Sequence, residues 1–167
     1  LAIEAKWREP KYPTVGKWLD DPNGDKLNRL KVLKGWINRL VLEDADIDLT
    51  RYSEIVYQLL HRAASAVKAA GSDKTPGMAM IVFSLEGDAG QDINEYKEQL
   101  LKLKKAPGMG KVGVFLIEVR MKSVGYERIK DKIKGVAETA VDVKRELQGK
   151  RKLFEFEHEI VTEIAAQ

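Results

Sequence analysis

Hydrophobic and polar positions divide the chain into eight elements. Short apolar or alternating runs predict strands, whereas apolar residues three to four positions apart predict helices. The elements follow the order strand, helix, helix, strand, helix, strand, helix, strand, which favours an α/β fold with a central mixed sheet flanked by helices. The predicted strands span residues 1–7, 77–85, 112–121 and 154–160, and the predicted helices span residues 26–42, 52–70, 92–105 and 124–147.

The four predicted strands differ in their patterns. Residues 77–85 and 112–121 are almost entirely apolar, which predicts central strands covered on both faces. Residues 154–160 alternate strictly, which predicts a half-exposed edge strand that is available to pair with a second copy in a homodimer. The first strand has Leu1, Ile3, Ala5 and Trp7 on one side and Ala2, Glu4 and Lys6 on the other. We expect this strand to be central as well. Glutamate and lysine are rarely buried in a central strand, so their presence there favours a functional role.

Composition narrows the class of protein. The 167 residues, with 44% hydrophobic and 33% charged, suit one globular domain. The absence of cysteine excludes disulfides, cysteine-based zinc sites and thiol nucleophiles, and two histidines are too few for a histidine-rich metal cage. No apolar run is long enough to cross a membrane and no signal peptide is visible, so we expect a cytoplasmic protein. Because the chain begins at Leu1 within a strand, we also expect the front of the domain to precede it.

Charge is distributed unevenly around a net value of +3. Residues 101–152 contain 15 Lys and Arg against 6 Asp and Glu, whereas residues 153–167 contain four Glu and no Lys or Arg. The basic stretch suits a surface that faces nucleic-acid phosphates. Its interleaved acidic residues suit a solvated helix face equally, so both interpretations stay open here.

The sharpest local feature is Glu4-Ala5-Lys6. Residues two apart on a strand share one face, so a carboxylate that binds a divalent cation would lie beside a lysine that positions water or steadies phosphate charge. A solvated ion pair is the common alternative. A second pattern, Glu118 with Lys122 behind an upstream loop containing Asp88 and Asp92, has a different lysine spacing and also fits a strand that runs out of the core.

The helix over 52–70 carries a polar stripe opposite its apolar face. Gln58, His61, Arg62 and Ser65 follow the i, i+3, i+4, i+7 spacing of one helix side. Gln58 suits a bond to substrate or water, Arg62 suits a bidentate grip on phosphate, and His61 suits a general base or an ordinary surface histidine.

Aromatic residues near the first strand have two interpretations. Trp7, Trp18 and Trp36 are typical of core or loop anchors. Tyr12 and Trp18, which lie near the Glu-x-Lys strand in sequence, are the candidates for stacking against nucleobases.

The run Leu1-Ala-Ile-Glu-Ala-Lys-Trp-Arg-Glu-Pro-Lys-Tyr12, the segment 57–66 and the strand over 78–84 resemble the PD-(D/E)xK nuclease-like superfamily, in an uncharacterised prokaryotic branch. The resemblance covers roughly residues 1–120 and implies a restriction-endonuclease-like core. It implies that Glu4 binds Mg²⁺, with Mn²⁺ as a substitute, that Lys6 orients the attacking water, and that Gln58 is the helix-borne glutamine of some branches. The superfamily's first aspartate stands before the Glu-x-Lys strand, so we expect it upstream of Leu1.

These observations lead to one functional prediction and one alternative. Residues 1–122 would form the nuclease-like core, and residues 123–167 a helix and an edge strand packed on it. The core would hydrolyse nucleic-acid phosphodiesters, of DNA rather than RNA, with Glu4, Lys6 and Gln58 as catalytic residues and His61 and Arg62 as substrate-binding residues. The alternative is an inactive nuclease-like module that binds nucleic acid or a protein partner.

Overall fold

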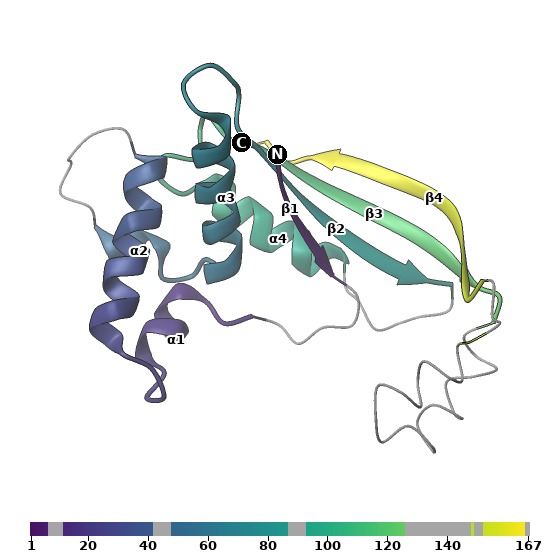
Figure 1. Ribbon diagram of the computed structural model, residues 1–167, viewed down its shortest axis with the longest axis horizontal. Coiled ribbons are helices and arrows are strands. Elements are labelled where there is room, and N and C mark those ends of the chain that lie inside the picture. Colours follow the sequence, from purple (N-terminus) through teal and green to yellow (C-terminus); the bar gives the residue numbers. More distant parts are fainter. Residues whose placement is uncertain (7–11, 42–47, 87–92, 126–147, 149–151, 166–167) are drawn as a thin grey trace.

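The computed structural model describes residues 1–6, 12–41, 48–86, 93–125, 148 and 152–165. Its four strands form one mixed sheet in the order β1-β2-β3-β4, in which the first three are parallel and β4 runs antiparallel to β3 (Figure 1). The α/β class and the mixed sheet predicted from the sequence are therefore confirmed. The strands span Ala2–Lys6 (β1), Gly77–Leu85 (β2), Gly113–Ser123 (β3) and Phe154–Glu163 (β4).

The helices are arranged in two layers beside the sheet. α3 packs against β1 and β2, and α4 packs against β3. α2 lies on the far side of α3, with α1 against it (Figure 1). None of these described helices is long and apolar enough to cross a membrane. The helices span Val15–Asp20 (α1), Lys26–Leu40 (α2), Tyr57–Ala70 (α3) and Ile93–Lys104 (α4), with a short 3-10 helix, η1, over Leu49–Tyr52.

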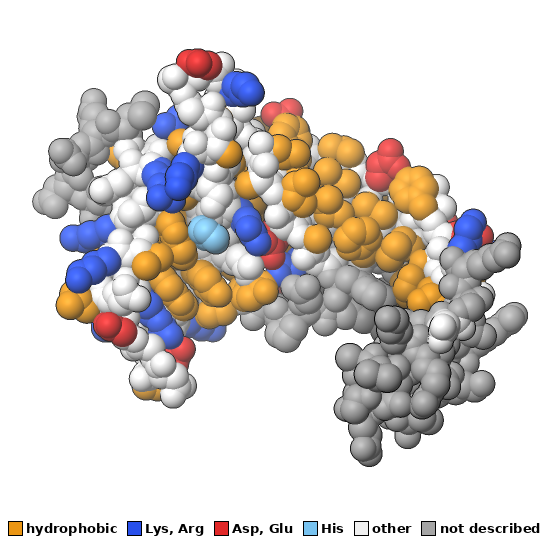
Figure 2. Space-filling model, in the orientation of Figure 1, with side chains coloured by type: hydrophobic (Ala, Val, Ile, Leu, Met, Phe, Trp, Pro, Cys, Tyr) orange, Lys and Arg blue, Asp and Glu red, His pale blue; other side chains and the backbone are white. Residues whose placement is uncertain are grey.

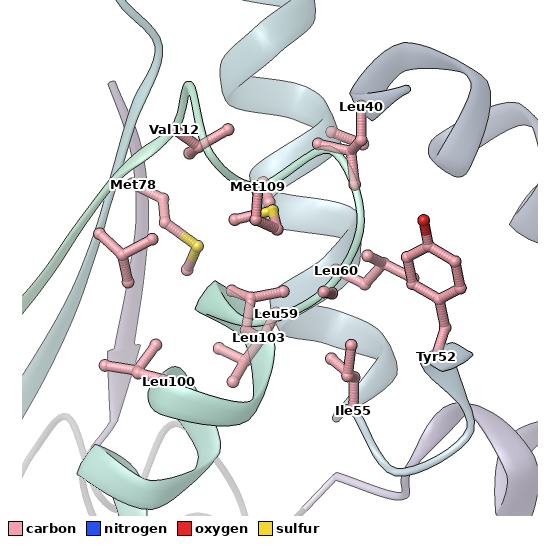
Figure 3. Packing of buried hydrophobic residues seen from close by; sticks show 14 of the residues in the cluster. Leu40, Tyr52, Ile55, Leu59, Leu60, Met78, Leu100, Leu103, Met109 and Val112 are labelled. Atoms are coloured by element: carbon pink, nitrogen blue, oxygen red, sulfur yellow. The ribbon is translucent and has the colours of Figure 1, made fainter. Parts of the chain in front are cut away.

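One hydrophobic core joins the sheet to both helix layers. Alternate residues of β2 and β3 point into it, because side chains on a strand alternate between faces. Figure 3 shows Met78 of β2 in this core together with Leu59 of α3 and Leu100 and Leu103 of α4. The loop after α4 closes the core at one end, where Gly108 adopts a φ of 79° and a Cβ would lie 2.6 Å from the Leu40 backbone. Residues at the centre of this core include Leu59, Leu60, Met78, Met80, Leu100, Leu103, Met109, Val112 and Val114.

The opposite face of the sheet is also apolar but is not covered by any described helix. Ile3 on β1 and Phe156 and Val161 on β4 are exposed there, and most outward-facing residues of β2 and β3 are only partly buried, apart from the buried Ala79 and Leu85. Figure 2 shows the resulting hydrophobic area across the strands. Within the described part of the chain, the sheet is therefore covered on one face.

Several predicted boundaries differ from the structure. The helix predicted from residue 52 begins at Tyr57, because residues 49–52 form η1 and Val56 is extended before α3. α1 was not predicted, since six residues with one buried side chain leave too short a pattern to detect. β1 lies at an edge of the described sheet and not at its centre, because β2 is its one partner among the described strands.

The end of the chain agrees with the prediction where it is described. β4 lies at an edge of the sheet formed by the described strands, as expected, and extends to Glu163. Its pairing with a second copy stays a prediction. The helix predicted over 124–147 lies outside the described residues, apart from its first two positions.

Candidate functional site

The first strand buries its polar side. Glu4 and Lys6 are each 5% exposed and face the layer that contains α3, whereas Leu1 and Ile3 on the other side are 73% and 50% exposed. Parallel pairing places Glu4 beside Met80 and Lys6 beside Val82, two core residues of β2. The carboxylate and the ammonium group therefore lie in an apolar setting, where charges need partners.

Three charged groups satisfy one another at this position. Lys6 Nζ lies 2.8 Å from Glu4 Oε1, and Arg62 Nε donates a hydrogen bond of 2.7 Å to Glu4 Oε2. Arg62 comes from α3 and its side chain is 36% exposed, so it reaches from the surface to the buried carboxylate. Burial raises the pKa of Glu4, but hydrogen bonds and charges from Lys6 and Arg62 outweigh it and hold this pKa below its ordinary value. Glu4 is therefore ionised at neutral pH.

A pocket of about 400 Å³ adjoins this charged group. Glu4, Lys6 and Gln58 all line it, so the structure brings together the three residues predicted to be catalytic. Its remaining walls are apolar and aromatic residues with polar side chains from α1 and α4: Tyr12, Pro13, Thr14, Lys17, Val56, Leu59, Met80, Glu95, Tyr96 and Gln99.

The α4 side of the pocket was missed by sequence analysis. Glu95 and Gln99 are one helical turn apart and therefore share a face, but this spacing is equally common on solvated helices. The side-chain oxygens of Gln58 and Gln99 are buried, and among the described residues neither has a hydrogen-bond partner. Two amide groups in this wall thus retain unused hydrogen-bonding capacity.

Neither His61 nor Arg62, the two residues predicted to bind substrate, is among the residues that line the pocket. The His61 ring lies 4.9 Å from that of Trp36. Burial lowers the pKa of His61, with Arg62 and Arg39 adding to the effect and Glu4 opposing it. The imidazole is therefore neutral at neutral pH and behaves as an aromatic ring.

His61 belongs to an aromatic cluster that we define as Tyr12, Trp18, Trp36, Tyr57 and His61. The rings of Trp18 and Tyr57 are 5.1 Å apart with an interplanar angle of 10°, and those of Trp18 and Trp36 are 5.5 Å apart at 16°. Tyr12 meets Tyr57 edge to face at 6.0 Å, and Lys6 Nζ lies 3.8 Å from the centre of the Tyr12 ring. The cluster thus extends from the pocket wall to the outer surface of α2 and α3.

The second candidate pattern does not form an equivalent group in the described residues. Glu118 Oε1 accepts a 3.0 Å hydrogen bond from Arg120 Nε and a 3.3 Å bond from Ser84 Oγ. Lys122 is exposed, while Asp88 and Asp92 lie outside the described residues. Glu118 and Arg120 therefore form a partly solvated ion pair.

The donor set for a metal ion is small. Among the described residues, no three His, Cys, Asp or Glu side chains converge on one point. Glu4 still fits a magnesium ion, since Mg²⁺ is often held by one or two carboxylates with water and substrate phosphate as the other ligands. One Glu4 oxygen would then have to exchange its ion pair for the metal.

Comparison with known proteins gives one match. Residues 1–122 match a protein family described as a domain of unknown function (DUF6946). No curated protein and no solved structure matches the chain.

Proposed function

The chain belongs to the DUF6946 family, and we propose that its function is the metal-dependent hydrolysis of phosphodiester bonds in nucleic acid, on a restriction-endonuclease-like core. The observation that carries this proposal is the buried Glu4–Lys6 pair on the wall of a pocket, with Arg62 bound to Glu4. Burying ionised groups is costly, and apolar residues of similar size often serve packing equally well or better. A buried carboxylate and lysine beside a pocket therefore favour a chemical role.

Each side chain has a distinct part in the proposed reaction. Glu4 would hold the metal ion, Mg²⁺ or Mn²⁺, which would supply Lewis-acid polarisation of a phosphoryl oxygen. Arg62, with its partly exposed side chain, would bind the substrate phosphate. Lys6 remains charged and donates a hydrogen bond to the attacking water, and Gln58 orients the same water or the phosphate.

The covalent change is a simple hydrolysis. The water oxygen forms a bond to phosphorus while the bond from phosphorus to the leaving sugar oxygen breaks. One proton of the water ends on that leaving oxygen, so no other reactant is consumed. Lys6 faces the negative charge that develops on the phosphate and stabilises it.

The direct test is plasmid nicking by the full-length protein with Mg²⁺ or Mn²⁺. We expect Lys6→Ala to lower the nicking rate by about 10²-fold or more, in line with the loss of a group that stabilises the transition state. Arg120→Ala removes the basic residue of the matching pair on β3 and should leave the rate unchanged. Equal nicking by the native protein and Lys6→Ala would remove Lys6 from the mechanism.

A second candidate function is binding without cleavage. The Glu4–Lys6–Arg62 group has a net charge of +1, and Lys17 also lines the pocket, so a phosphate has cationic partners there without any metal. A nuclease should show a Mg²⁺-dependent rise in melting temperature that Glu4→Ala abolishes. A binding module should instead show salt-sensitive DNA affinity in EDTA and no response to Mg²⁺.

A further inference from the structure

We propose that the aromatic cluster is a base-stacking surface and that it selects single-stranded nucleic acid as the substrate. The inference rests on the proposed function, because the cluster begins at the pocket that holds Glu4 and Lys6. It concerns the form of the nucleic acid, which the charged group alone leaves open.

The rings of the cluster share one orientation. Tyr57, Trp18 and Trp36 are parallel to within 10° to 16°, and the His61 ring is inclined by 28° to Trp36. These rings come from α1, α2 and α3, so the packing of three helices is needed to align them. A base that enters parallel to the rings would extend an existing stack. Because the rings are already aligned, little conformational entropy would be lost.

The rings are also open to the surface. All five members of the cluster are partly buried and none is fully buried. Figure 2 shows hydrophobic side chains at the surface between α2 and α3, with Lys and Arg side chains around them. An aromatic group that served packing alone would be expected inside the core, as Tyr52 is at 1% exposure.

Cationic groups accompany the rings from one end to the other. Lys6 lies over Tyr12, and Arg29 Cζ lies 5.6 Å from the centre of the Trp18 ring. Arg62 follows His61 in α3 and reaches the Glu4 carboxylate. Rings flanked by cations are the arrangement with which proteins bind single strands, since bases stack while phosphates meet positive charge.

Duplex nucleic acid does not suit this surface. Its bases are paired and stacked on one another, so their faces are not available to protein rings, whereas unpaired bases can be splayed onto aromatic side chains. A strand with a phosphate at Arg62 and Lys6 would place its neighbouring bases on the cluster. The charged group and the aromatic cluster can therefore both be occupied when the nucleotides next to the cleaved bond are unpaired.

The first experiment measures binding in EDTA, where metal-dependent hydrolysis cannot occur. Fluorescence anisotropy would compare a labelled single-stranded DNA, its duplex, and an abasic strand of the same length with the full-length protein. We expect the single strand to bind at least about tenfold more tightly than either competitor, since stacking on one ring contributes about 1–3 kcal/mol per base. Equal affinity for the abasic strand would overturn the inference.

The second experiment assigns the effect to the cluster. Trp36→Leu and His61→Ala should each weaken single-strand binding by about fivefold or more, with little change for the duplex. Phe156→Ala is the matched control, since Phe156 is an aromatic residue 61% exposed on β4 and outside the cluster. His61→Ala removes a surface ring, so it keeps the test valid if Trp36→Leu fails to fold. The melting temperature of each variant shows whether that variant is folded. Native affinity in both variants would overturn the inference.

The two proposals fail in different ways. If neither plasmid DNA nor a single-stranded DNA is cut with Mg²⁺ or Mn²⁺ but the base-dependent preference is present, the nuclease proposal fails and the stacking surface stands. If cleavage depends on Lys6 but the abasic strand binds as well as the natural one, the stacking surface fails and the nuclease proposal stands.

Discussion

Two strands of the sheet carry a glutamate followed two residues later by a basic residue, and their surroundings are very different. On β1 the side chains of Glu4 and Lys6 are both 6% exposed and their charged atoms are 2.8 Å apart. On β3 the side chains of Glu118 and Arg120 are 14% and 50% exposed at 3.0 Å. The two ion pairs are therefore similar in length but differ in access to water.

Helix coverage produces this difference. Lys6 and Glu118 lie at the same level of the sheet, on either side of Val82. α3 covers β1 and contributes Arg62, whereas the buried positions of β3 end at Leu116, before the pair is reached. A Glu-x-basic pattern becomes a candidate site only where a helix closes over it and adds a third charge.

The largest expected effect comes from removing each glutamate. Glu4→Ala leaves Lys6 buried without its carboxylate and should lower the free energy of unfolding by about 3–5 kcal/mol. Glu118→Ala should lower it by about 0–1 kcal/mol, because Arg120 is half exposed and water replaces its partner. Urea denaturation of both variants measures the two values. Similar losses would show that the two pairs are equivalent after all.

The next effect concerns the basic partners that reach the surface. Arg62→Ala should lower the free energy of unfolding by about 1.5–3 kcal/mol, since it removes a hydrogen bond to a buried charged oxygen. Arg120→Ala, the counterpart on β3, should cost less than about 1 kcal/mol. Thermal and urea unfolding of the pair provide the measurement, and a larger loss for Arg120→Ala would contradict the role given to α3.

Acid should remove the contribution of Glu4 to stability. Because the folded-state pKa of Glu4 lies below its ordinary value of 4.5, its contribution is present above that value and is lost as pH falls through the folded-state pKa. Glu4→Gln should therefore show a shallower fall in the free energy of unfolding in acid than the native protein. Denaturation series between about pH 5 and pH 2 test this, and parallel curves for native and Glu4→Gln would contradict it.

The smallest effect is the response to salt. A double-mutant cycle of Glu118 and Arg120 should give a coupling of about 0.2–1 kcal/mol at low salt that largely disappears in about 1 M NaCl, because exposed charges are screened. The same cycle on Glu4 and Lys6 should keep most of its coupling, since screening is weak for a buried pair. If the coupling between Glu4 and Lys6 disappeared at high salt, that pair would be exposed to water and not buried.

The sequence predicted which of these residues share one side of their element. Glu4 and Lys6 share a side because strand residues alternate, and Gln58 and Arg62 share a side because residues four apart on a helix do. A helix that connects two parallel strands packs back on their sheet, which brings α3 onto β1 and β2. Local periodicity therefore predicted the shared sides of β1 and α3, and the structure added the contact between Arg62 and Glu4.

Other features depended on contacts between distant segments. The alternation of β1 identified two sides but not which one is buried, and the structure buries the side with Glu4 and Lys6 while exposing Leu1 and Ile3. Gln99 and Tyr96 enter the pocket through the packing of α4, and the parallel rings of Trp18, Trp36 and Tyr57 need three helices in register. Neither arrangement leaves a periodic signal in any one segment.

The amino-acid sequence by itself determined the α/β class, the mixed sheet and the pairing of Glu4 with Lys6, because these follow from side-chain period and short-range geometry. The tertiary structure alone decided that β1 lies at a sheet edge, that α3 closes over its polar side, and that this pair differs from Glu118 and Arg120. The physical reason is desolvation. Whether a charge lies in water or in a low-dielectric interior depends on which elements cover it, and coverage is a property of the whole fold.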